Sequence, residues 1–163
     1  MGLAEARAHL ASFGRESDVI EFASSSATVE LAAQELGTEP AHIAKTLAFH
    51  DGDTGRALLV VAAGDARVHS GPFRRQFGFK PRMLGAEDVE RLTGHPVGGV
   101  CPFANPAGTR VFLDVSLQRF ETVYPAAGST NSAIRLTVPE LLEYSGALDW
   151  VDVTKDWQPG QDS

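Results

Sequence analysis

Apolar residues recur at helical spacing in two segments near the start of the chain. This spacing predicts a helix over Leu3–Phe13, followed by Gly14 where a helix commonly ends. It predicts a second helix over Val29–Leu36, which begins after the capping residue Thr28 and stops at Gly37. The inward face of this second helix would carry Ala32, Ala33 and Leu36.

The middle of the chain has the pattern of a hairpin of buried strands. Pro40 stands in the first turn of a further predicted helix that leads into Ile43–Phe49, and the latter half of that segment has the character of a strand. The turn cluster Asp51–Gly55 then precedes the continuous apolar run Ala57–Ala63, which is typical of a strand buried on both faces. The two segments together predict a central hairpin.

Shorter segments on either side predict the remaining elements. We expect strands over Asp18–Phe22, Val111–Val115, Thr122–Tyr124, Ala133–Leu136 and Val151–Val153. We expect helices or helical turns over Phe73–Phe77, Gly85–Leu92 and Ser116–Phe120, and from the capping box Thr137–Glu140 to Ser145. Because strands and helices do not alternate regularly, the fold class expected is α+β: a mixed, mostly antiparallel sheet surrounded by short helices. One domain should span residues 1–155, with a polar, frayed tail over 156–163.

Composition agrees with one globular domain. The chain has 163 residues, of which 43% are hydrophobic and 21% charged. Its single cysteine, Cys101, forms no internal disulfide, which fits a reducing compartment. No apolar run approaches the roughly 18 residues that a membrane-spanning helix needs, and Met1–Phe13 carries charges where a signal peptide would be apolar. We therefore expect a soluble, cytoplasmic protein without a membrane partner.

The charge is distributed unevenly. The formal net charge is −7, which argues against a general DNA-binding protein. The window from Ala66 to Arg82 nevertheless has no acidic residue, and its cations are Arg67, Arg74, Arg75, Lys80 and Arg82. Such a basic segment on an acidic body fits one docked polyanion. Phe73, Phe77 and Phe79 lie between these cations, and the alternative is a solvated helix face with core aromatics.

Three further positions are candidates for chemistry. Lys45 stands among apolar neighbours, where an ammonium facing a cleft could hold a phosphate or polarise a carbonyl; the alternative is an edge lysine that reaches to solvent. The loop Gly98–Pro102 could aim backbone N–H groups at a developing oxyanion, although most Gly/Pro loops only turn the chain. Gly128–Asn131 is a second small polar loop, with a simple turn as its alternative.

Other catalytic classes lack their residues. Cys101 could act as a nucleophile in an ester or thioester hydrolase, yet no histidine stands in a known cysteine-hydrolase pattern. The five histidines are dispersed without metal-ligand spacing, and no P-loop, GxGxxG or GxSxG motif occurs. We therefore expect neither metal nor cofactor.

These separate signals coincide in one resemblance. The motif Ala44–Leu47, the strand Leu58–Ala63, the loop Val97–Phe103 and the segment Val123–Asn131, followed by Thr137–Leu141, resemble the YbaK family. Members of this family are free-standing relatives of the editing domain of bacterial prolyl-tRNA synthetases. The similarity runs in order from about Thr28 to Val153.

The resemblance implies hydrolysis in trans of the ester that joins a wrong amino acid to tRNA. Such editing is needed because a binding pocket distinguishes amino acids that differ by one methylene only about 10- to 200-fold. The catalytic residues implied are Lys45, Gly98, Gly99, Val100 and Pro102, and the substrate-binding residues are Thr46, Cys101, Phe103, Gly128 and Ser129. A ribose hydroxyl of the tRNA would assist the attacking water.

The basic window then supplies candidate tRNA contacts by charge alone, namely Arg67, Arg74, Arg75, Lys80 and Arg82. Some alanine-specific members carry Asn beside the lysine, where this chain has Thr46. The identity of the small amino acid that is removed therefore stays open. An aminoacyl-tRNA synthetase is a further candidate partner. The alternative function is a module of the same fold that binds tRNA or an aminoacyl group without hydrolysis.

Overall fold

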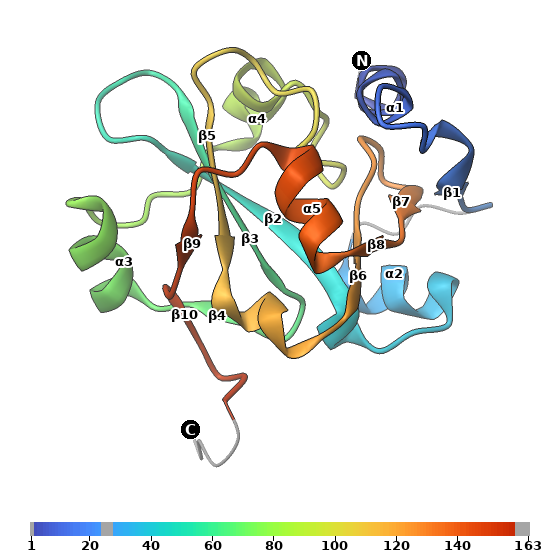
Figure 1. Cartoon of the computed structure of the whole chain (residues 1–163). Helices are drawn as coiled ribbons and strands as arrows, with labels where there is room; N and C mark the ends of the chain where they lie inside the picture. The colour runs from blue at the N-terminus through green and yellow to red at the C-terminus, as the bar shows by residue number, and fades with distance from the viewer. Residues whose placement is uncertain (1, 24–27, 159–163) are drawn as a thin grey trace.

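The apolar run Ala57–Ala63 forms the central strand β3, and all seven of its residues are buried. The computed structural model describes residues 2–23 and 28–158 and surrounds this strand with a mixed sheet and short helices (Figure 1). The helices are α1 (Leu3–Ala11), α2 (Val29–Leu36), α3 (Ser70–Phe77), α4 (Ala86–Thr93) and α5 (Val138–Ser145), with the 3₁₀ turns η1 (Glu16–Asp18), η2 (Pro40–His42) and η3 (Val115–Arg119). The other strands are β1 (Val19–Glu21), β2 (Ile43–His50), β4 (Arg67–Val68), β5 (Arg110–Asp114), β6 (Thr122–Pro125), β7 (Ser132–Ile134), β8 (Leu136–Thr137), β9 (Trp150–Val151) and β10 (Thr154–Lys155). Within the described residues, no helix is both long and apolar enough to cross a membrane.

Six strands form the main sheet in the order β8-β6-β2-β3-β5-β9, and β1-β7 and β10-β4 form two-stranded sheets beside it. The longest pairing is the antiparallel hairpin β2-β3, in which Lys45 lies opposite Ala62. Of the seven pairings among the described strands, four are antiparallel and three are parallel. The predicted α+β fold with a mixed, mostly antiparallel sheet is therefore confirmed.

Alternation along β3 separates two apolar layers. Leu59 and Val61 face the larger layer, to which α1, α4 and α5 contribute. Leu58 and Val60 face a smaller layer in which Phe73 of α3 is fully buried. Because both faces of β3 are covered, its sequence reads as continuous apolar residues rather than as an alternating pattern.

The predicted elements exist, and most boundaries lie within a few residues, but the single strand expected over Ala133–Leu136 is two strands, β7 and β8, in different sheets. One prediction is wrong in kind: Pro40 opens only the 3₁₀ turn η2 instead of a helix, and strand β2 covers the whole of Ile43–His50. The physical reason is pairing, because β3 binds β2 along its length and β6 also binds Ile43 and Ala44. Tertiary pairing overrides the local helix-start signal of a Pro.

The C-terminal segment packs more closely than a frayed tail would. Trp157 donates its indole N–H to Thr154 Oγ1 at 2.8 Å, and the Arg119 guanidinium lies 4.9 Å from the Trp157 ring centroid. The expected tail over 156–163 thus includes a tryptophan that contacts the domain. Residues 159–163 lie outside the described part.

Candidate functional site

A cavity of about 200 Å³ opens beside the first half of β2. It is lined by Thr28, Val29, Ala32 and Leu36 from α2, by Ile43, Ala44, Lys45 and Thr46 from β2, by Gly98 and Val100, and by Tyr124, Ala126, Ser129, Thr130, Ser132 and Ala133. The space exists because β6 pairs with β2 only at Ile43 and Ala44. Beyond Ala44, Lys45 and Thr46 still line the cavity, whereas the far end of β2 is covered where Phe49 forms an isolated bridge with Met83.

Lys45 lies at this wall, and its ammonium is anchored. Its Nζ donates to the carbonyl oxygen of Gly64 at 3.2 Å and to that of Ala66, both in the turn that follows β3. Burial lowers the pKa of Lys45 below its ordinary value; Asp65 and Glu30 act in the opposite direction, and Arg67 adds to the lowering. An ammonium has three N–H donors, so one remains for a ligand.

Thr46 follows Lys45 and therefore faces the other side of the strand. It lines the cavity, and its hydroxyl oxygen is buried without a hydrogen-bond partner among the described residues. A buried hydroxyl without a partner costs free energy, which makes this atom a candidate to bind a polar group of a ligand.

The two predicted loops meet at the cavity. A Cβ atom on Gly99 would lie 2.7 Å from Ser129 Cα, so the two backbones are in direct contact and only glycine fits there. Gly98 and Val100 face the cavity, whereas the N–H of Gly99 donates to Pro96 O at 2.9 Å and is occupied. The N–H groups of Gly98 and Val100 have no acceptor within residues 2–23 and 28–158.

The second half of the first loop belongs to the core. Cys101 and Phe103 are 0% exposed, Pro102 is also buried, and the cavity lining includes none of the three. The predicted substrate contacts of Cys101 and Phe103 stay predictions, and apolar packing places both side chains in the core rather than at the cavity. Asn105 Nδ2 donates to Cys101 O at 3.1 Å, so this half anchors the half that faces the cavity.

The second loop divides in the same way. Ser129 lines the cavity and its hydroxyl donates to Asn131 Oδ1 at 2.9 Å. Gly128 is buried against the backbone of Gly2, 2.5 Å from where its Cβ would lie, and makes no part of the lining. Gly128 thus joins the loop to the N-terminal segment, and its predicted contact with substrate stays a prediction.

Cys101 is not placed as a nucleophile. Its Sγ lies 3.4 Å from His95 Nε2, but that nitrogen is 2.6 Å from the carbonyl oxygen of Phe103 and must donate a proton to it. Nε2 therefore cannot accept the thiol proton. Burial also raises the pKa of Cys101 to about 12, so the thiol stays protonated.

The sequence prediction missed the wall opposite β2. Ala32 and Leu36 were expected to face inward, and they do so at the cavity together with Val29. Tyr124 and Ser132 also line it. The small residues on one face of a capped helix were the available signal, but periodicity alone does not distinguish a core face from a cavity wall.

The cations of the basic window are spread over several elements, and none of them is among the described residues that line the cavity. Arg67 lies on β4 and affects the pKa of Lys45, whereas Arg74 and Arg75 lie on α3 and Lys80 and Arg82 follow it. All five side chains are exposed. Figure 1 shows α3 at the left and α2 at the right, with the sheet between them. The interleaved aromatics Phe73, Phe77 and Phe79 belong to the smaller apolar layer, as the alternative interpretation expected.

Among the described residues, no group of three or more His, Cys, Asp or Glu side chains could hold a metal ion.

Comparisons with known proteins give one family model and several similar proteins. A family model described as an aminoacyl-tRNA editing domain matches residues 23–144. The protein YwhH of Bacillus subtilis (strain 168), which is named as uncharacterised, is 51% identical over 158 residues, covering 97% of this chain and 100% of its own length.

Two solved structures are similar over nearly the whole chain. A crystal structure described as that of a candidate trans-editing enzyme for prolyl tRNA synthetase has a TM-score of 0.82 at 29% identity, and the match covers 94% of this chain and 97% of that one. The hypothetical protein APE2540 has a TM-score of 0.76 at 30% identity, covering 89% and 99%.

Burial of Cys101 predicts that its thiol does not react in the folded protein. A rise in its pKa from 9.0 to about 12 lowers the thiolate fraction at pH 8 by about 10³-fold. Labelling with a chromogenic disulfide reagent at pH 8 should therefore be slower by at least this factor in native protein than in guanidinium. Because the chain has one cysteine, the unfolded sample is the internal control. Stoichiometric labelling of native protein at the unfolded rate would contradict the burial and favour the cysteine-hydrolase alternative.

Proposed function

Because the chain belongs to the aminoacyl-tRNA editing domain family, we propose that it is a trans-editing hydrolase, which cleaves the ester of a mischarged aminoacyl-tRNA carrying a small amino acid. The observation that carries this proposal is the anchored ammonium of Lys45 at the wall of a small cavity that Gly98 and Val100 also line, with backbone N–H groups that have no acceptor among the described residues. These are donors of the kind that stabilise charge developing on an ester carbonyl.

The cavity supports a small side chain on the amino acid. The cavity has a volume of about 200 Å³, and helix α2 closes one side of it with Val29, Ala32 and Leu36. The aminoacyl group would lie in this cavity, and the tRNA end would extend from its mouth. An apolar wall limits the size of the side chain that fits, because larger side chains are excluded. An editing site needs this size selection after a synthetase has accepted a wrong amino acid.

The chemistry we propose depends on positioning. The remaining N–H of Lys45 and the N–H groups of Gly98 and Val100 would bind the carbonyl oxygen or the neighbouring phosphate. None of the described lining residues is Asp, Glu, His or Cys. A hydroxyl of the terminal ribose would therefore take the place of a protein base, and water would attack the carbonyl carbon, releasing the amino acid and free tRNA.

Thr46 would recognise the amino group. Its hydroxyl oxygen has no partner among the described residues, and an α-ammonium is a donor that would satisfy it. The exposed cations Arg67, Arg74, Arg75, Lys80 and Arg82 would bind acceptor-stem phosphates, with Arg67 nearest in electrostatic terms to Lys45. A synthetase could deliver the substrate, and translation would place this activity in the cytoplasm.

Hydrolysis should depend on Lys45. The substrates are tRNA(Pro) and other tRNAs, each charged with labelled Ala, Ser, Thr, Cys or Pro. We expect the protein to release the labelled amino acid, with selectivity for one small residue. Lys45→Ala should lower kcat/KM about 10²- to 10³-fold, the usual loss for an oxyanion donor. Lys155→Ala is the matched control, because Lys155 is exposed and outside the cavity lining. Stability of the whole panel with retained tRNA affinity would favour the binding-module alternative.

Thr46→Val should weaken the reaction without weakening the fold. The substitution keeps the shape and removes the hydroxyl, so kcat/KM should fall about tenfold, the value of one hydrogen bond to a charged group. The melting temperature should stay equal or rise, because a buried oxygen without a described partner is removed. Thr46→Ser keeps the hydroxyl and should retain activity. Equal rates for Thr46→Val and wild type would exclude recognition through this atom.

Neutralising a cation of the basic window should reduce the salt dependence of tRNA affinity. Each of Arg67→Gln and Arg74→Gln should reduce the slope of log K against log salt by about 1 if it removes one phosphate contact. The control is Arg91→Gln on α4, an exposed cation outside this window. Unchanged slopes in both window variants, measured by filter binding at several salt concentrations, would exclude the window as a tRNA surface.

A further inference from the structure

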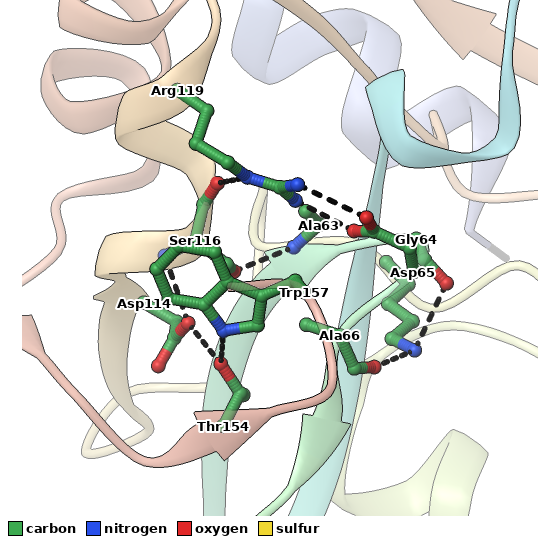
Figure 2. A network of polar contacts seen from close by, with 10 residues as sticks. Ala63, Gly64, Asp65, Ala66, Asp114, Ser116, Arg119, Thr154 and Trp157 are labelled. Atoms are coloured by element: carbon green, nitrogen blue, oxygen red, sulfur yellow. Dashed lines mark hydrogen bonds and ion pairs between the residues drawn. The ribbon is translucent and has the colours of Figure 1, made fainter. Parts of the chain in front are cut away.

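The turn that anchors Lys45 is itself held by an ion pair that the proposed chemistry does not use. Gly64, Asp65 and Ala66 connect β3 to β4, and Arg119 in η3 binds the Asp65 carboxylate with both terminal nitrogens, at 3.0 and 2.6 Å (Figure 2). Such a two-pronged pair fixes the orientation of both partners. We call Asp65 and Arg119 the clamp.

Arg119 is supported from several directions. Its Nε donates to Ser116 O at 2.9 Å, and its guanidinium lies 4.7 Å from the Phe120 ring centroid and 4.9 Å from that of Trp157. Figure 2 shows the indole of Trp157 bonded in turn to Thr154. A guanidinium packed against rings and bonded on both edges has few other rotamers available, so its position is defined before any ligand arrives.

The same network fixes the start of the turn. The hydroxyl of Ser116 accepts a hydrogen bond from the N–H of Ala63, the last residue of β3, at 3.1 Å. The Ser116 N–H donates to the buried carboxylate of Asp114 at 3.0 Å (Figure 2). The chain is therefore held just before the turn, at Ala63 through Ser116, and at the middle of the turn through Asp65.

The turn contacts both parts of the candidate site. The carbonyls on either side of Asp65, those of Gly64 and Ala66, accept from Lys45 Nζ. A Cβ on Gly64 would lie 2.7 Å from Val29 Cγ1, so the turn also packs against the helix that lines the cavity. A displacement of Asp65 would therefore move the two acceptors of the ammonium and the wall facing it.

We infer that Arg119, acting through Asp65, is a positioning residue for the Lys45 ammonium. The clamp holds the Gly64–Ala66 turn so that its two carbonyls aim the third N–H of Lys45 at the cavity. The catalytic consequence rests on the proposed function, but the positioning itself does not. Asp65 also acts on the ammonium through its charge. Burial lowers the pKa of Lys45, the Asp65 carboxylate raises it, Arg67 lowers it and Glu30 raises it.

The chain is well suited to a direct test, because its only lysines are Lys45, Lys80 and Lys155. In protein labelled with ¹³C-lysine, three Cε signals are expected, and Lys45→Arg assigns the relevant one. An anchored side chain gives its two Hε protons different chemical shifts, whereas exposed lysines average them. We expect separated Hε shifts for Lys45 in the wild type and converged shifts in Arg119→Gln and Asp65→Asn.

A control variant and an activity measurement separate the positioning of Lys45 from its catalytic consequence. Arg91→Gln breaks the Asp88–Arg91 pair on α4 and should leave the Lys45 signals unchanged. Asp65→Asn keeps the side-chain shape and removes the charge. It therefore tests the clamp if Arg119→Gln fails to fold. Deacylation by both clamp variants should fall about 10- to 100-fold, since a misplacement of about 1 Å costs up to 10²-fold.

Lys45 Hε protons that stay separated in both folded clamp variants would overturn the positioning role, whatever the activity. Convergence in the variants together with a wild type that hydrolyses no aminoacyl-tRNA would support the clamp and overturn the proposed function instead. Convergence together with the expected loss of hydrolysis would support both.

Discussion

The pairing of β2 with the fully buried strand β3 is the constraint on which the rest of the molecule depends. Seven consecutive buried residues on β3 require cover on both faces of the sheet, and the short helices supply it. The register of this hairpin places Lys45 opposite Ala62, next to the turn that ends β3. The lysine therefore meets backbone carbonyls at the edge of an apolar layer rather than solvent alone.

Alternation along β2 then gives consecutive residues different tasks. Lys45 binds the Gly64–Ala66 turn, whereas the hydroxyl of Thr46 is buried without a partner among the described residues. Burial lowers the pKa of Lys45 and Asp65 offsets part of that lowering, while the ammonium donates to the two backbone carbonyls. A cation held in this way needs little reorganisation when a ligand arrives, which is the physical basis of electrostatic catalysis.

The loops show how a site can be built without reactive side chains. Gly99 lets two loop backbones touch at Ser129, and the buried Cys101 and Phe103 anchor the chain beyond it. The loop thus presents the backbone of Gly98 and Val100 to the cavity while its own side chains stabilise the core. Residues that a motif groups together therefore divide into those that face the cavity and those that hold the loop.

The sequence by itself determined the fold class and the β2-β3 hairpin, because local apolar periodicity encodes them, and one family motif marked Lys45 as a candidate. It did not determine which motif residues face the cavity, since Cys101 and Gly99 are neighbours of Val100 in sequence but differ from it in burial and contacts. It also gave no sign that Asp65 and Arg119 pair, because a contact between residues 54 positions apart depends on how η3 packs beside the β3–β4 turn. Such long-range contacts arise only in the packed chain, and they decide where the ammonium of Lys45 points.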